Sequence, residues 1–147
     1  MVTINPFLSF KGNCEEAFNL YKSIFSTDFS HIVRYKGIPS ENPIPDSKKE
    51  KIMHIALPIS KEIILMGCDV FETLGRTPKT ESNLSLSVNT QSEEETTRIF
   101  DALATDGIIS FPLSKTFRCS KSDMWIDNFG IQWMISLANK QNSQVKK

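Results

Sequence analysis

The chain has 147 residues, of which 39% are hydrophobic and 23% charged, a composition typical of one soluble globular domain. Its 17 basic and 17 acidic residues cancel, so no net charge favours nucleic acid or an anionic membrane as a partner. No apolar run approaches the ~20 residues of a membrane span, and "MVTINPFLSF" lacks the features of a signal peptide. The cysteines Cys14, Cys68 and Cys119 fit no disulfide framework. We therefore expect a cytoplasmic protein with reduced thiols.

The first half of the sequence predicts the element order β, α, β, β, β. Apolar residues alternate with others in four segments, as in strands, and they recur at helical spacing after Asn13. Asn13 is expected to cap this helix, and Glu15 and Glu16 suit the positive end of its dipole. A loop with three prolines, residues 37–50, separates the second and third strands. The expected strands cover residues 2–10, 29–35, 51–59 and 62–70.

The second half repeats this order, and "QSEEE" at its helix start corresponds to "NCEEA" in the first half. Thr90 or Ser92 is expected to cap the second helix, and Gly107 to end it in a left-handed conformation. The sequence thus predicts an α+β fold of two βαβββ modules, residues 1–71 and 82–138, within a single domain of residues 1–140. Residues 139–147 are polar and are expected to form a disordered tail. The expected elements are the strands 83–89, 108–117, 122–128 and 131–138 and the helix 90–107.

Alternation along each strand assigns its side chains to two faces of a sheet. One set is expected to pack against the helix, and this set includes Ile4, Met53 and Leu84. The opposite set would line solvent or a ligand cavity. Two aromatic residues, Phe7 and Trp125, are expected on this second face.

The chain also carries a family pattern in five segments that run in order along it: "NPFLSFKGNCEEAFNLYKSIF", "KIMHIALPI", "ILMGCD", "NLSLSVNTQSEEETTRIFDALATDG" and "DNFGIQWMISL". Together they resemble the PhnB-like branch of the vicinal oxygen chelate superfamily, which includes glyoxalase, bleomycin-resistance and extradiol-dioxygenase folds. The resemblance implies that the two modules form a curled mixed or antiparallel sheet with a concave groove. It also implies a homodimer.

The resemblance has a consequence for metal binding. Metal-using members of the superfamily place His, Glu or Gln on the first and fourth strands of each module, and strand register carries these positions to Asn5, Met66, Asn83 and Met134. Amide oxygens and thioethers are weak ligands for the divalent ions of such sites. We therefore expect no metal and no other cofactor, and no metal-dependent glyoxalase or dioxygenase activity.

Relatives in this branch have been labelled ubiquinone methyltransferases. Adenosylmethionine sites of the nucleotide-binding type need a glycine-rich turn between strand and helix. Here the two turns are "FKGNCEE" and "NTQSEEE", which hold one glycine between them. The sequence therefore does not predict this activity.

Several residues each allow a functional and a structural interpretation. His54 is either a general acid or base or a half-buried histidine bonded to a neighbouring strand, whereas His31 is expected on ordinary surface. Asn5 and Asn83, at equivalent places in the two modules, either bind an oxygen of a ligand or bond each other. The thiol of Cys14 at a helix start could have a lowered pKa or be inert.

Other residues have weaker claims to a functional role. Cys68 is expected to be buried and inert. Arg34 and Arg118 are the arginines best placed to meet an anion, although most such arginines are surface residues. The loop of residues 37–50 is expected to be a mobile lid over the groove, with a passive surface insertion or an arm on a dimer partner as the alternatives.

From these features we predict a small-molecule-binding protein that uses neither nucleic acid nor a membrane as a partner. The alternative is a metal-independent enzyme in which His54 is the acid or base. The residues expected to line the ligand groove are Asn5, Phe7, His54, Met66, Asn83, Ser85, Trp125, Gln132 and Met134.

Overall fold

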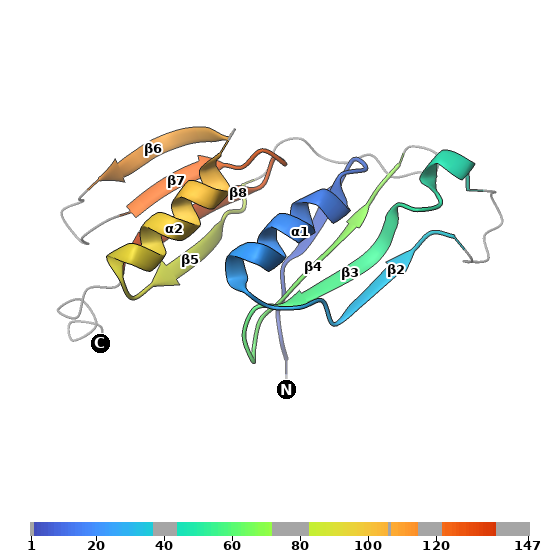
Figure 1. Cartoon of the computed structure of the whole chain (residues 1–147), viewed down its shortest axis with the longest axis horizontal. Coiled ribbons are helices and arrows are strands. Elements are labelled where there is room, and N and C mark those ends of the chain that lie inside the picture. The colour runs from blue at the N-terminus through green and yellow to red at the C-terminus, as the bar shows by residue number, and fades with distance from the viewer. Residues whose placement is uncertain (1, 37–43, 72–82, 106, 115–121, 138–147) are drawn as a thin grey trace. The chain divides into compact units, whose positions relative to one another are not determined.

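The computed structural model describes residues 2–36, 44–71, 83–105, 107–114 and 122–137. The chain forms two compact units, residues Met1–Lys79 and Thr80–Lys147 (Figure 1), and we call their described parts the first and second modules. The first module contains β1 (Phe7–Phe10), α1 (Cys14–Phe25), β2 (His31–Arg34), the short 3-10 helix η1 (Asp46–Lys48), β3 (Ile52–Pro58) and β4 (Ile64–Asp69). The second contains β5 (Leu86–Thr90), α2 (Glu93–Ala104), β6 (Ile108–Ser114), β7 (Ser122–Ile126) and β8 (Gln132–Leu137).

Both modules have the same sheet topology. The strand order is β1-β4-β3-β2 in the first and β5-β8-β7-β6 in the second. In each, the first strand pairs parallel with the last, and the other pairs are antiparallel. The predicted α+β fold of two βαβββ modules with mixed sheets is therefore confirmed.

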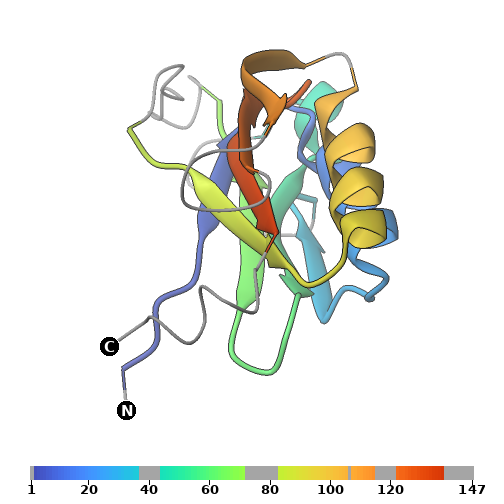
Figure 2. The ribbon, with the colours of Figure 1, turned by 90° about the vertical axis from the view of Figure 1, so that its left-hand side faces the viewer.

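One helix packs on one face of each sheet, as Figure 2 shows from the end of the molecule. In the first module Phe18 lies edge-on to both Phe10 and Tyr21, with ring centroids 6.1 and 5.6 Å apart. Ile55 and Leu57 of β3 are fully buried in the same core. In the second module Ile99 and Leu103 of α2 are buried, and Phe100 lies edge-on to Trp125. These apolar stripes are those that the helical spacing predicts.

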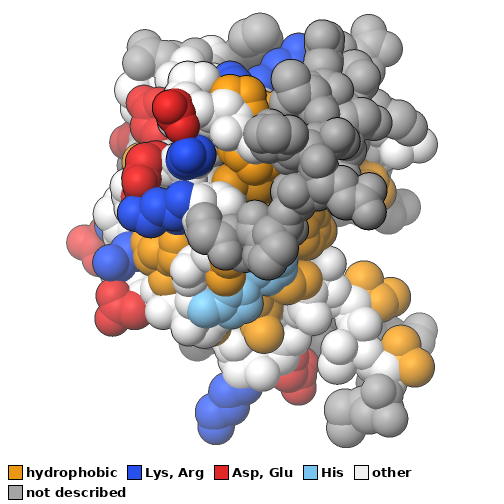
Figure 3. Space-filling view, turned by 90° about the vertical axis from the view of Figure 1, so that its right-hand side faces the viewer, with side chains coloured by type: hydrophobic (Ala, Val, Ile, Leu, Met, Phe, Trp, Pro, Cys, Tyr) orange, Lys and Arg blue, Asp and Glu red, His pale blue; other side chains and the backbone are white. Residues whose placement is uncertain are grey.

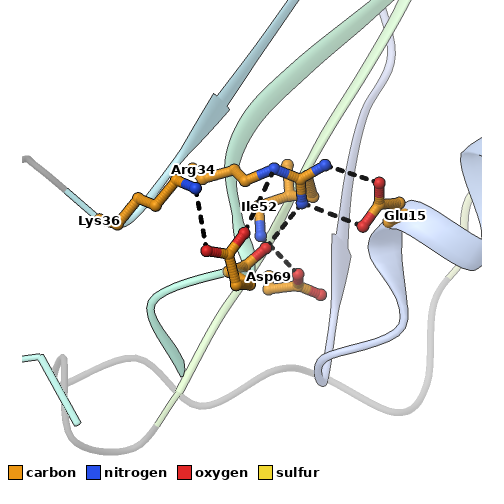
Figure 4. Close-up of polar contacts among 6 residues, drawn as sticks. Glu15, Arg34, Lys36, Ile52 and Asp69 are labelled. Atoms are coloured by element: carbon orange, nitrogen blue, oxygen red, sulfur yellow. Dashed lines mark hydrogen bonds and ion pairs between the residues drawn. The ribbon is translucent and has the colours of Figure 1, made fainter. Parts of the chain in front are cut away.

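The start of α1 differs from the prediction. Asn13 makes no side-chain hydrogen bond to the helix. Instead, Asp69 at the end of β4 accepts hydrogen bonds on Oδ1 from the backbone N–H groups of Gly12 and Cys14. Its Oδ2 accepts a hydrogen bond from the backbone N–H of Ile52, which Figure 4 shows. Asp69 is 1% exposed, so a buried carboxylate from the sheet satisfies the helix start that Asn13 was expected to satisfy.

The start of α2 follows the local rule. Ser92 has an extended backbone, and its side chain accepts a hydrogen bond from the backbone N–H of Glu95. Ser92 was one of the two predicted caps. The other, Thr90, is buried and its hydroxyl is hydrogen-bonded to that of Thr96.

Three predictions are wrong: the burial of Ile4 and Leu84 in a core, the placement of Met53 on the helix-packed face, and the left-handed end of α2 at Gly107. Ile4 and Leu84 are 86% and 75% exposed rather than buried in a core, because β1 and β5 begin only at Phe7 and Leu86. A β-bulge between β2 and β3 reverses the alternation, so Ile52 is fully buried while Met53 is partly exposed.

Gly107 does not end α2 in a left-handed conformation: the helix ends at Ala104, and its C-cap is Thr105, with a φ of −57° and a ψ of 125°. A Cβ at Gly107 would lie 2.3 Å from the backbone oxygen of Ile126. A close backbone approach therefore explains this glycine. Within the described residues, no helix has the length and apolar character needed to cross a membrane.

Candidate functional site

The first module has a sheet face opposite α1, which we call the outer face. Paired residues on neighbouring strands project to the same side of a sheet, so the register defines two rows on this face. The first row runs Phe7, Met66, Ala56, His31, through the pairs Phe7–Met66, Ala56–Met66 and His31–Ala56. The second row contains Ser9 opposite Cys68 and Val33 opposite His54.

The outer face brings together three rings. The ring of Phe7 lies 5.6 Å from that of His54 between centroids, and the ring of His54 lies 4.6 Å from that of His31. Phe7 is 49% exposed, although aromatic rings are usually buried. Figure 3 shows the histidines on the surface, flanked by hydrophobic side chains.

The two histidines are hydrogen-bonded to each other. Nε2 of His31 lies 2.5 Å from Nδ1 of His54. The nitrogens are much closer than the ring centroids and the ring planes differ by 15°, so the rings meet edge to edge. Partial burial and, secondarily, the charge of His31 lower the pKa of His54 from its ordinary value of 6.5.

His31 is the functional candidate that sequence reasoning missed. It was expected on ordinary surface, yet it is the hydrogen-bonding partner of His54. The structural interpretation of His54, as a half-buried histidine bonded to a neighbouring strand, matches this geometry. The sequence signal was only that the chain's two histidines lie on strands predicted to be consecutive along the chain.

Asn5 lies just before β1, where its side-chain oxygen accepts a hydrogen bond from the backbone N–H of Ile64, at 2.9 Å. The equivalent position in the second module is not Asn83. Met66 and Met134 are each the third residue of their strands, and they pair with Phe7 and Ser87. The register therefore matches Asn5 with Ser85 and corrects the expected equivalence.

The corresponding face of the second module is polar. Ser85 donates to the side-chain oxygen of Gln132 at 3.1 Å, and Ser136 donates to that of Asn89 at 2.8 Å. Met134 lies on the same side between these pairs. Three of the expected groove residues, Ser85, Gln132 and Met134, thus share one face of β5 and β8.

Two expected groove residues lie elsewhere. Trp125 is 1% exposed and packs against Phe100 of α2, so it belongs to the core of the second module. The prediction failed because β7 was given the wrong one of the two alternating faces. Asn83 is exposed and precedes β5.

The positions carried over for a metal hold no cluster of strong ligands. The oxygen of Asn5 is already bonded to Ile64, Met66 and Met134 are thioethers, and Asn83 lies outside the strand. Across the described residues, no group of three or more His, Cys, Asp or Glu side chains is arranged to hold an ion. A metal of the superfamily type does not fit these four side chains.

The remaining candidates have structural roles or lie outside the described residues. Burial, followed by the negative charge of Asp69, raises the pKa of the Cys14 thiol, so the helix dipole does not activate it. Arg34 pairs with both carboxylate oxygens of Glu15, at 3.0 and 2.7 Å, and donates to the backbone oxygen of Glu50 (Figure 4). Cys68 is buried. Arg118 and Cys119 lie outside the described residues.

The second half of the proline-rich loop is ordered against β2 and β3. The backbone N–H of Lys36 donates to Lys49, that of Tyr35 donates to Lys51, and Lys49 pairs with Asp46 of η1. Residues 37–43 lie outside the described residues, as do residues 138–147, which include the expected tail.

The fold and the register define a protein of the vicinal oxygen chelate superfamily, in its PhnB-like branch. A family model described as 3-demethylubiquinone-9 3-methyltransferase matches residues 2–136, and the chain belongs to this family. It is similar to the protein YjdN of Escherichia coli strain K12, with 26% identity over 96% of this chain and 99% of the relative.

Two solved structures with at least 30% identity to this chain support the family assignment. Protein PA1353 from Pseudomonas aeruginosa has 31% identity and a TM-score of 0.82, covering 93% of this chain and 98% of its own. A Bacillus cereus PhnB protein, described as a putative 3-demethylubiquinone-9 3-methyltransferase, has 30% identity and a TM-score of 0.78, covering 93% of this chain and 100% of its own. The fosfomycin resistance protein FosX from Mesorhizobium loti shares the fold alone, with 7% identity over 99% of each chain and a TM-score of 0.57.

Proposed function

We propose that this protein binds a small molecule on the outer face of the first module. The observation that carries the proposal is the half-exposed ring of Phe7, held against His54. Ligand sites combine apolar and aromatic surface with a few polar groups that orient the ligand. The outer face offers Phe7 and Met66 as apolar surface and the imidazoles of His31 and His54 as polar groups.

The polar face of the second module, taken by itself, is a weaker candidate for ligand binding. Its amides and hydroxyls are already bonded in pairs, Ser85 with Gln132 and Ser136 with Asn89. A ligand would have to compete with these bonds. We therefore assign recognition to the outer face of the first module rather than to Ser85, Gln132 and Met134 of the second.

We propose binding without a metal ion and without methyl transfer, despite the description of the family model. The four superfamily positions supply only amides and thioethers. At the start of α1, the N–H groups of Gly12 and Cys14 donate to Asp69. These N–H groups are therefore already bonded within the protein. A nucleotide-type cofactor would need donors of this kind to bind its anionic or polar atoms.

A second candidate function is a metal-independent enzyme in which His54 acts as acid or base. The hydrogen bond between His31 and His54 favours it, because a partner that orients an imidazole is a common feature of such catalysis. His54→Ala separates the two functions. It should abolish turnover if the protein is an enzyme, whereas in a protein that only binds it should weaken affinity by up to about tenfold, the loss of one hydrogen-bonding group.

We further propose that the protein is cytoplasmic and forms a homodimer. The thiol of Cys14 is free and buried, as expected in a reducing compartment. Light scattering at micromolar concentration should give twice the 16.7 kDa chain mass. A monomer throughout that range would contradict the dimer.

The binding proposal is tested by thermal denaturation against a metabolite library. A ligand at 100-fold excess over its dissociation constant should add about 2.7 kcal/mol of stability. The same screen is run on Phe7→Ser and on the control Ile32→Ser, which changes an apolar residue that is 39% exposed. Compounds that stabilise the wild type and Ile32→Ser but not Phe7→Ser support the proposal. Hits that stabilise all three proteins equally contradict it.

A further inference from the structure

Among the described residues in the two rows of the outer face, His31 and His54 are the exposed or half-exposed side chains that can carry a charge. The other side chains in the two rows, Phe7, Ser9, Val33, Ala56 and Met66, do not ionise, and the thiol of Cys68 is buried. Arg34, which follows Val33, pairs with Glu15 of α1. Among the described residues of these strands, the charge of the outer face therefore depends on His31 and His54.

The geometry couples the protonation of these two residues. Nε2 of His31 and Nδ1 of His54 face each other at 2.5 Å, and only one of two facing nitrogens can carry a hydrogen at such a separation. The neutral pair holds one hydrogen between the rings. One further proton can add from water at a nitrogen that does not face the other ring, which gives a single positive charge and keeps the bond. A second would require hydrogens on both facing nitrogens and break it.

We propose that His31 and His54 form one dyad that switches the outer face between neutral and singly positive, and that this face binds a small monoanion with an apolar body, such as an aromatic carboxylate. The inference rests on the proposed binding function and names its ligand class. The anionic group would accept a charge-assisted hydrogen bond from the protonated dyad. The apolar body of the ligand would lie on Phe7 of β1 and Met66 of β4, on the same sheet face as the dyad.

The lowered pKa of His54 is consistent with this coupling, because the charge of His31 is one of its two causes and burial is the other. Those causes include no carboxylate. Among the described residues, the two rows of the outer face also hold no carboxylate that would repel an added anion.

The first test needs no ligand. The chain contains two histidines, so NMR of an untagged sample follows both imidazole C–H signals through a pH titration. We expect two coupled steps separated by about one pH unit or more in the wild type, and a single step in His31→Asn and in His54→Asn. If each histidine titrates in the wild type as it does in the variant that lacks the other histidine, the dyad is overturned.

The second test uses benzoate as the anion and benzamide as its uncharged counterpart. Benzoate should bind the wild type about tenfold more tightly at a pH between the two titration steps, where the dyad is singly positive, than at a pH above both steps, where it is neutral. This difference is expected for a charge-assisted hydrogen bond. Benzamide affinity should not change with pH. The variant carrying both His31→Asn and His54→Asn should lose the pH dependence for benzoate.

The outcomes separate the two proposals. Benzoate that binds no better than benzamide at any pH, or does not bind, overturns the monoanion inference. Library compounds that require Phe7 but bind independently of pH would still support the proposed binding function. If no library compound depends on Phe7, the binding function itself fails, even if the titration shows two coupled steps.

Discussion

The two modules share one topology but begin their helices differently. The start of α1 is bonded by Asp69, which lies 55 residues from Cys14 in the sequence, whereas α2 is capped by its own Ser92. Strands β4 and β8 are of equal length, and the position of Asp69 is occupied by Leu137 in the second module. Without a carboxylate there, the second module depends on a local cap. Repeated architecture thus allows different solutions for the same unsatisfied N–H groups.

The outer faces differ in the same way. The first module carries Phe7 and the two histidines, while the second carries bonded pairs of hydroxyl and amide side chains. The helix-packed faces of both modules are mainly apolar. The shared topology therefore constrains one face of each sheet, and the other face is where a binding role could arise.

The largest expected effect separates the two helix starts. Asp69→Asn should reduce the free energy of unfolding by about 3 kcal/mol, because the amide is uncharged and its NH₂ group opposes backbone donors. Ser92→Ala should cost about 1 kcal/mol, the usual cost of losing a cap. Urea unfolding measures both.

Asp28→Asn is the control for charge removal, because that side chain is 90% exposed and should change stability little. An Asp69→Asn protein as stable as Asp28→Asn would show that the distant carboxylate does not stabilise α1.

A second difference between the modules concerns packing under the helix. Gly67 of β4 corresponds in strand position to Ile135 of β8. A Cβ at Gly67 would lie 2.7 Å from Cε1 of Phe18. Gly67→Ala should therefore destabilise the protein by about 2 kcal/mol through overpacking. Unfolding midpoints at wild-type level would mean that Phe18 shifts at no cost.

A smaller effect concerns the ion pair on the first module. Hydrogen bonding to Arg34 lowers the pKa of Glu15 below its ordinary 4.5. The contribution of the ionised Glu15 to the free energy of unfolding is therefore present above pH 4.5, and it is lost as the pH falls through the lower pKa of the folded protein. Because the pair is partly exposed, Glu15→Gln should cost only about 0.5 kcal/mol at pH 7. A cost that persists unchanged at pH 2 would contradict an electrostatic origin.

The smallest effect is expected from His54. Since its folded pKa lies below its ordinary 6.5, the unfolded chain binds the proton more readily. Stability is therefore complete above pH 6.5 and declines as the pH falls through the folded pKa. His54→Gln should flatten this part of the stability curve, measured as melting temperature against pH. Curves of identical shape for both proteins would contradict the shift.

Sequence periodicity was sufficient to predict the order of elements and most core positions, because helix and strand repeats depend on local burial. It could not predict the hydrogen bonds between Asp69 and the start of α1, since these residues lie far apart in the sequence of the first module. Nor could it pair His31 with His54, because a bulge and a long connection set their register. Trp125 was misplaced because both faces of β7 carry large apolar residues, Met124 and Ile126 on one and Trp125 on the other.

Two methionines at equivalent positions in the modules, Met66 and Met134, can show whether ligand binds the outer face of the first module. The chain has five methionines, so methyl-labelled NMR can follow each during titration with the library compound that most stabilises the protein. We predict that the signal of Met66 shifts in proportion to occupancy, together with those of both histidines, and by more than that of Met134. A shift confined to Met134, with Met66 and the histidines unchanged, would contradict the account.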